Sequence, residues 1–76
     1  MRDYRLEVCL QNSDGSFHTL RTHNFRSLDI REARVAADIW AANLTAVETG
    51  SHLRLFMGST AVASRPLNRW VWETLS

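Results

Sequence analysis

The sequence predicts an α+β fold in which a single helix packs on an antiparallel sheet, with the elements in the order β-β-α-β-β-β. Three observations predict it: apolar residues alternate along residues 4–10, a helical stripe follows from about residue 30, and alternation returns after residue 51. One helix against one sheet makes a two-layer domain. Because 76 residues suffice for one small domain, we expect residues 1–76 to form a single unit.

The first two strands form a predicted hairpin. Apolar and polar residues alternate along residues 4–10, as they do in a strand with one buried face. Asp14-Gly15 follows, and this pair favours a tight hairpin turn because glycine readily adopts positive φ. We expect the return strand roughly over residues 16–25. Its alternation slips at Leu20, and a β-bulge near residues 18–21 would restore it.

The helix is predicted from about Ile30 to Ala46. Asp29 has the position of an N-cap, and Glu32 lies three residues further on, which is the spacing of a capping box. Gly50 can take the left-handed conformation that ends a helix. One apolar stripe at helical spacing should face the sheet, and it consists of Ile30, Ala33, Ala37, Trp40, Ala41 and Leu44.

Three further strands are predicted after the helix. Residues 52–57 alternate, Gly58-Ser59 makes a turn, and residues 60–65 form a short fourth strand. Pro66 interrupts the pattern, since proline has no amide donor for a ladder. Residues 69–75 are rich in β-prone tryptophan and valine and form the predicted last strand.

The balance of charges argues against a strong nucleic-acid-binding surface. Nine basic and eight acidic side chains leave a formal net charge of +1, whereas nucleic-acid-binding domains are usually clearly basic. All nine basic side chains are arginine. Either a GC-rich genome explains this bias, or the surface is built for bidentate contacts with carboxylate or phosphate.

The residues predict no enzyme, no metal site and no cofactor. The three histidines have no cysteine or histidine partner at zinc-binding spacing. Cys9 lies mid-strand without a neighbouring base and is interpreted as a structural thiol, which as a lone cysteine forms no internal disulfide. No apolar run is long enough to cross a bilayer, and a strand pattern begins directly after the first residues. We therefore expect a cytoplasmic protein without a signal peptide or a membrane partner.

The predicted helix offers one candidate binding surface. It carries a second apolar stripe nearly opposite the first, formed by Leu28, Val35, Ile39, Ala42 and Ala46. Either the sheet curls around the helix and these residues border the core, or the stripe is exposed and contacts a partner. Arg31 and Arg34 flank it.

The predicted last strand offers a second surface. Either Val71 and Leu75 face the helix and leave both tryptophans exposed beside arginines, or the tryptophans belong to the core. The candidate partner-binding residues on the sheet side are therefore Trp70, Trp72, Arg69, Arg54 and Arg65. On the helix side they are Arg31, Arg34, Val35 and Ile39.

Three short segments resemble those of very small phage and prophage proteins. They are Ser-Leu-Asp-Ile-Arg-Glu-Ala-Arg at residues 27–34, Leu-Arg-Leu-Phe at residues 53–56 and Arg-Trp-Val at residues 69–71. Some anti-CRISPR inhibitors of type I surveillance complexes are similar in size and element order. The resemblance covers about residues 24–71. It implies a non-catalytic inhibitor that acts in the bacterial cytoplasm and occupies a surface where a CRISPR effector receives DNA or another protein. The lack of lysine means that no lysine contact carries over.

Two other interpretations stay open. One is a small nucleic-acid-binding or antitoxin-like module that uses the open sheet face. The layout of strand, Asp-Gly turn, strand and alanine-rich helix with Trp40 is also similar to that of HicB-type antitoxins, which implies the antitoxin-like form of this module. Alternatively, the extra apolar surface forms the interface of a homodimer, which is compatible with an inhibitor.

Overall fold

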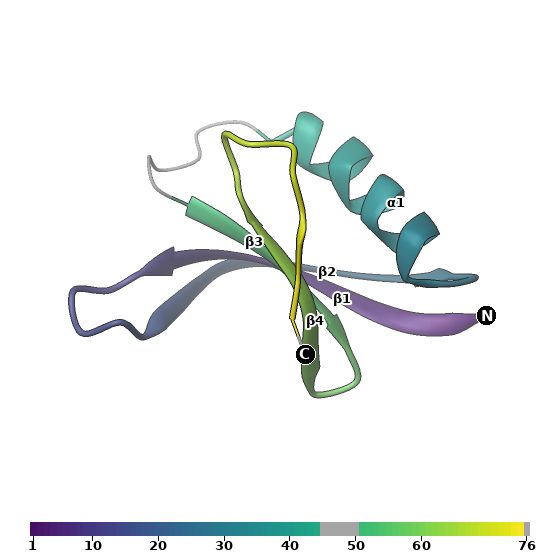
Figure 1. Ribbon diagram of the computed structural model, residues 1–76, viewed down its shortest axis with the longest axis horizontal. Coiled ribbons are helices and arrows are strands. Elements are labelled where there is room, and N and C mark those ends of the chain that lie inside the picture. Colours follow the sequence, from purple (N-terminus) through teal and green to yellow (C-terminus); the bar gives the residue numbers. More distant parts are fainter. Residues whose placement is uncertain (45–50, 76) are drawn as a thin grey trace.

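The computed structural model describes residues 1–44 and 51–75, in which one helix covers one face of a five-stranded antiparallel sheet (Figure 1). The α+β class and the β-β-α-β-β-β order are therefore confirmed. The elements in chain order are β1 (Arg2–Gln11), β2 (Phe17–Ser27), α1 (Ile30–Ala42), β3 (Ser51–Met57), β4 (Thr60–Pro66) and β5 (Glu73–Thr74).

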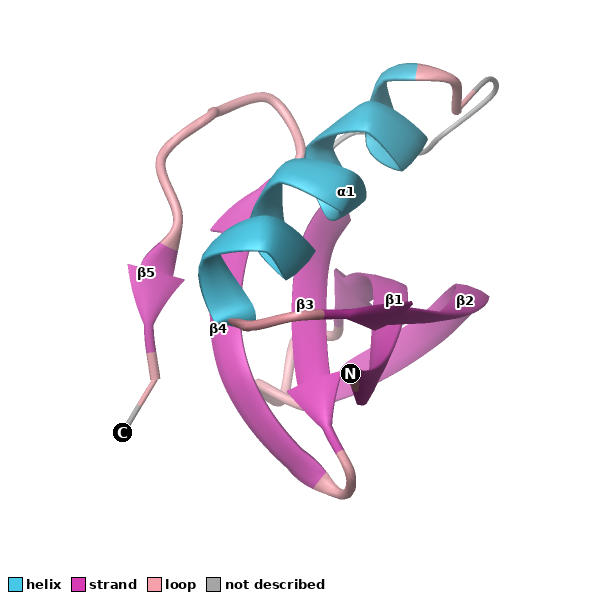
Figure 2. Ribbon diagram, turned by 90° about the vertical axis from the view of Figure 1, so that its right-hand side faces the viewer, coloured by secondary structure: helices cyan, strands magenta, loops and turns pink. Residues whose placement is uncertain are grey.

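The strands lie in the order β2-β1-β3-β4-β5, so that α1 carries the chain from one edge of the sheet to its centre. Figure 2 shows the helix across one face, with the short β5 at the opposite edge from β2. None of the helices in the described residues is long and apolar enough to cross a membrane.

The predicted bulge in the return strand is confirmed. Val8 pairs with Arg21 and Cys9 pairs with Thr19, which leaves Leu20 as the extra residue of β2. The shift restores the alternation because it moves the following residues to the other face of the sheet. The side chain of Leu20 thereby packs against the core.

The core lies between α1 and the two central strands. Leu6 of β1 and its cross-strand neighbour Leu55 of β3 are completely buried. They pack with Ala33 and Ala37, which are also completely buried on the inner face of α1. Small alanine side chains let the helix backbone approach the leucines closely, so the sheet side supplies most of the buried apolar volume.

A stack of four rings joins α1 to the first hairpin. The ring of Trp40 lies parallel to that of His23 with centroids 5.0 Å apart, and His23 stacks on Phe25 at 5.6 Å. Phe25 in turn stacks on the buried Tyr4 at 5.9 Å. Offset stacking of this kind adds to the energy of apolar burial. His23 is half-buried between the rings of Trp40 and Phe25.

The helix begins as predicted and ends earlier. The Asp29 side chain accepts a hydrogen bond of 2.9 Å from the Glu32 amide, which is the expected N-cap. The helix stops at Ala42, because Asn43 leaves the helical conformation and its side-chain amide donates to the Ile39 carbonyl at 3.0 Å. The predicted stop at Gly50 and the predicted stripe residue Ala46 lie outside the described residues.

The predicted last strand over residues 69–75 is wrong in extent, because only Glu73–Thr74 pairs with β4. The preceding residues instead curl around the side chain of Arg65. The Arg69 amide donates back to the Pro66 carbonyl at 3.2 Å, which closes a turn rather than extending the chain. The β-propensity of the tryptophans is thus overridden by the hydrogen bonds that hold this segment around Arg65.

Candidate functional site

The outer face of α1 carries a row of exposed apolar side chains. Val35 and Ile39 are 59% and 64% exposed, and Ala42 is exposed next to them along the helix. Leu28, which precedes the N-cap Asp29, is 63% exposed. We call these four residues the outer helix strip. The helical spacing of Val35, Ile39 and Ala42 places them opposite Ala33, Ala37 and Ala41, which face the sheet. The interpretation that this second stripe borders the core is therefore wrong for Val35, Ile39 and Ala42, because the sheet lies against the opposite side of the helix. Leu28 does reach the margin of the core, since it lines a hollow together with Tyr4 and Val62.

Two arginines lie on α1 near the outer helix strip. Arg31 is exposed and Arg34 is partly buried. Within the described residues, neither guanidinium makes a hydrogen bond or an ion pair. An unpaired guanidinium at the rim of an apolar strip supplies polar contacts to a partner without first breaking an internal one.

A buried arginine fastens the segment after β4 to α1. Arg65 is 1% exposed, and its Nε donates to Asp38 Oδ1 at 2.9 Å. Its Nη1 donates to three backbone carbonyl oxygens, those of Pro66 at 3.1 Å, Leu67 at 3.2 Å and Arg69 at 2.6 Å. Its Nη2 lies 2.9 Å from the same Asp38 oxygen without a hydrogen bond to any described residue, so that contact is ionic. The prediction of Arg65 as a partner-binding residue is therefore wrong, because its guanidinium is buried and its Nε and Nη1 donate to groups inside the protein.

The two tryptophans of the predicted last strand have different roles. Trp72 is partly buried against the core, and its indole N–H donates to Asp38 Oδ1 at 3.1 Å. Trp70 covers the guanidinium of Arg65, whose Cζ lies 4.6 Å from the ring centroid, yet Trp70 is 62% exposed. Val71 is 74% exposed. Neither predicted alternative holds in full, because the segment is not a regular strand and its side chains do not alternate.

Of the remaining predicted residues, Arg69 is exposed and Arg54 lies on the sheet face away from the helix. The sheet thus lies between Arg54 and the outer helix strip. The structure therefore divides the predicted binding residues between three places: α1, the exposed Trp70 with its neighbour Arg69, and the open sheet face.

On the open face, arginines and phenylalanines alternate in space. Arg54 Cζ lies 4.6 Å from the ring centroid of Phe17 and 5.0 Å from that of Phe56, and Arg5 Cζ lies 4.5 Å from the Phe56 centroid. Phe17, Phe56 and Arg5 were not predicted from the sequence as members of this group. Strand parity placed Arg54 and Phe56 on one face, but the register between strands, which brings in the other two, could not be read from the sequence.

Cys9 shares this open face and is completely buried. Burial raises the pKa of its thiol, and a hydrogen bond from Thr19 partly opposes that effect. A thiol held in its protonated form is a poor nucleophile. This agrees with the interpretation of Cys9 as a structural residue.

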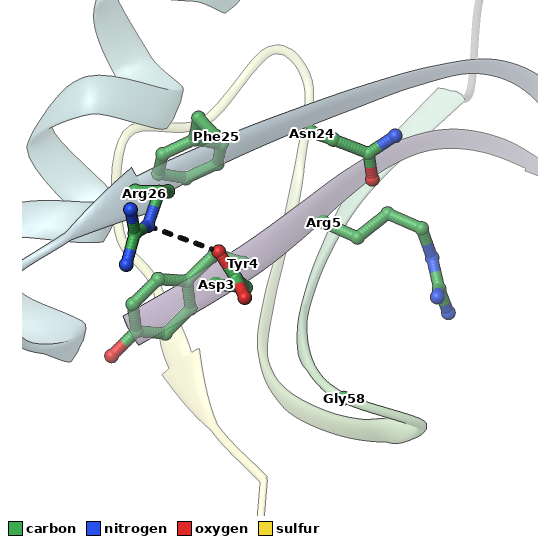
Figure 3. A pocket seen from close by; sticks show the side chains of 7 residues that line it. All are labelled: Asp3, Tyr4, Arg5, Asn24, Phe25, Arg26 and Gly58. Atoms are coloured by element: carbon green, nitrogen blue, oxygen red, sulfur yellow. Dashed lines mark ion pairs between the residues drawn. The ribbon is translucent and has the colours of Figure 1, made fainter. Parts of the chain in front are cut away.

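A hollow of about 410 Å³ opens at the end of the first hairpin (Figure 3). Tyr4 and Phe25 form one wall, Arg5 and Asn24 project away from them, and Arg26 pairs with Asp3 at 3.2 Å between nitrogen and oxygen. The lining residues provide neither a nucleophile beside a base nor a pair of carboxylates. In residues 1–44 and 51–75, there is also no cluster of three metal-ligating side chains.

No family model matches this chain, and neither the curated proteins nor the solved structures contain a significant match to it.

Proposed function

We propose that this protein is a non-catalytic binding protein that docks on a partner protein through the outer helix strip. The observation that supports the proposal is the exposure of Val35 and Ile39, each by more than half, on the side of α1 that faces away from the sheet, with Leu28 similarly exposed just before the helix. Single exposed apolar residues are ordinary on protein surfaces, but a row of them on one element is typical of an interaction site.

The fixed position of α1 adds to this proposal. The helix is held on one flank by the stacking of Trp40 on His23 and on the other by the ion pair of Asp38 with Arg65. A surface that is rigid before binding loses little conformational entropy when it docks, so a few apolar contacts suffice for useful affinity. Arg31 and Arg34 would supply the polar rim.

The partner we propose is a type I CRISPR effector complex of a bacterial cell, with this chain as a phage-encoded inhibitor. This finer proposal depends on the sequence resemblance. Two of the segments that carry it, residues 27–34 and residues 69–71, include Leu28, Arg31, Arg34 and the exposed Trp70. An inhibitor of this size would block the complex by occupying a surface that DNA or another protein normally contacts.

A co-purification assay tests both levels of the proposal. The protein is immobilised and incubated with purified type I effector complexes, in parallel with the Val35→Asp/Ile39→Asp variant and with a Ser59→Asp control in the exposed turn before β4. We expect a complex to be retained by the original protein and the control, and to be lost with the double variant. Retention that survives the double variant contradicts the role of the strip, and no retention of any type I complex removes the finer proposal.

Light scattering separates a foreign partner from a second copy of this chain. If the protein is a dimer that Val35→Asp/Ile39→Asp converts to a monomer, the outer helix strip is a self-interface. We expect both the original protein and the double variant to be monomers.

A further inference from the structure

We propose that the open face of the sheet carries a carboxylate-binding site centred on Arg54, which takes an acidic side chain from an extended peptide segment. The site lies on the opposite side of the sheet from α1 and does not depend on the function proposed for the outer helix strip.

The rings of two phenylalanines hold the Arg54 side chain in place. Its Cζ lies within 4.6 Å of the Phe17 centroid and 5.0 Å of the Phe56 centroid. Cation–π contacts of this kind are attractive and restrict the otherwise flexible arginine stem. Because the rings contact the guanidinium, its N–H groups remain the part that is available to hydrogen-bond acceptors.

Those N–H groups have no partner among the described residues. No hydrogen bond or ion pair joins Arg54 to any of residues 1–44 or 51–75, although it is only partly exposed. A partly buried guanidinium with unpaired donors is poised to accept an anion, because little additional water must be removed when the anion binds.

The carboxylate that faces Arg54 across the strands is already engaged. Glu7 lies directly opposite Arg54 in the register of β1 with β3. One of its oxygens accepts from Arg5 Nε at 2.8 Å, and the other accepts from Thr19 Oγ1 at 3.0 Å and from Cys9 Sγ at 3.8 Å. Glu7 therefore neutralises Arg5 and leaves the positive charge of Arg54 uncompensated.

The charge of this face favours a single carboxylate over a nucleic acid. Among the described residues of this face, Arg54 is the arginine without an ion pair, and the face also carries Glu7 and, in register beyond Ser64, Glu73, both of which would repel a chain of phosphates. A guanidinium presents parallel N–H donors that match the two oxygens of a carboxylate. The ring of Phe17, which is 40% exposed, offers an apolar contact for a neighbouring residue of the same segment.

The experiment follows the Arg54 Nε–Hε signal by nuclear magnetic resonance while N-acetyl-tetraglutamate is added, with N-acetyl-tetraglutamine as the uncharged control. We expect the signal to move with tetraglutamate alone. Arg54→Gln should abolish the saturable shifts of neighbouring amides, and Arg54→Lys, which keeps the charge but loses the paired donors, should weaken binding about tenfold. Both variants are first checked for an unchanged amide spectrum elsewhere, and Arg54→Lys remains informative if Arg54→Gln unfolds.

Two controls and two further ligands make the outcome decisive. The control variants alter the outer helix strip or the arginine beside it, and they are Val35→Asp/Ile39→Asp and Arg31→Gln. Both should leave the tetraglutamate titration unchanged, so that failure of the Arg54 site is distinct from failure of the proposed function. Equal responses to both peptides, or no response to tetraglutamate, overturn the site. Binding of oligothymidylate or inorganic phosphate through Arg54 without binding of tetraglutamate assigns the residue to phosphate and also overturns the proposal.

Discussion

Asp38 and Arg65 form an ion pair between α1 and β4 in which Arg65 Nε and Nη2 both lie 2.9 Å from one carboxylate oxygen. The arginine side chain is fully buried, whereas the aspartate side chain is 26% exposed. The same oxygen accepts the Trp72 indole N–H. One carboxylate thus positions the helix, the buried arginine and the chain that leads into β5.

Removal of this carboxylate should destabilise the fold strongly. We expect Asp38→Ala to lower the free energy of unfolding by about 3 kcal/mol, because it leaves the buried Arg65 charge without its counterion. Urea denaturation followed by circular dichroism measures the change. Asp3→Ala, which breaks the exposed pair with Arg26, is the matched control and should cost less than about 1 kcal/mol. Equal losses for the two variants would contradict the structural role of Asp38.

Two leucines distinguish the core from the outer helix strip. Leu6 is completely buried, so Leu6→Ala should destabilise the protein by about 2–5 kcal/mol through the cavity that it leaves. Leu28 is 63% exposed, and Leu28→Ala should change stability by no more than about 0.5 kcal/mol. Thermal and urea unfolding of both variants tests the pair. A large loss for Leu28→Ala would mean that the strip belongs to the core.

The fluorescence of individual tryptophans should report their different environments. In a variant with Trp40 and Trp72 replaced by phenylalanine, the remaining Trp70 should be quenched readily by acrylamide, because it is 62% exposed. In the variant that keeps only Trp72, quenching should be weaker, since that ring packs against the core. Stern–Volmer slopes in the reverse order would contradict this arrangement of the two rings.

Stability should fall at alkaline pH because of Cys9. Burial raises the pKa of its thiol above the ordinary value of 9.0, so the unfolded chain loses this proton before the folded protein does. The contribution of Cys9 is therefore intact below pH 9 and is lost as the pH rises through the higher folded-state value. Urea midpoints between pH 7 and pH 10.5 measure the decline, which should be smaller in Cys9→Ala. An identical decline in that variant would remove Cys9 as its cause.

Local patterns were sufficient to predict most of this fold. Strand alternation, the Asp29 cap and the slip at Leu20 depend on neighbours in the sequence, and each has its expected counterpart in the structure. The role of Arg65 could not be read in this way, because arginine is usually exposed and its partner Asp38 lies 27 residues earlier. The shortened last strand follows from the hydrogen bonds that this buried arginine donates to the carbonyl oxygens of Pro66, Leu67 and Arg69.

The two candidate surfaces also differ in whether they depend on local or long-range contacts. The outer helix strip follows a helical period, so the sequence contained its pattern and left undecided only whether these side chains are exposed. The surroundings of Arg54 depend on the register of three strands, which brings Phe17 of β2 and Phe56 of β3 to the same guanidinium. A shift of one residue in either pairing would place these rings on opposite faces.

The contacts on both flanks of α1 also bear on the kinetics of any complex. Since Trp40 stacks on His23 at one side and Asp38 holds Arg65 at the other, the helix has little freedom to roll against the sheet. A docking molecule would meet the same contour at every encounter, with no slow rearrangement before the complex forms. Substitutions in Val35 or Ile39 should then shorten the lifetime of the complex while its rate of formation stays nearly constant.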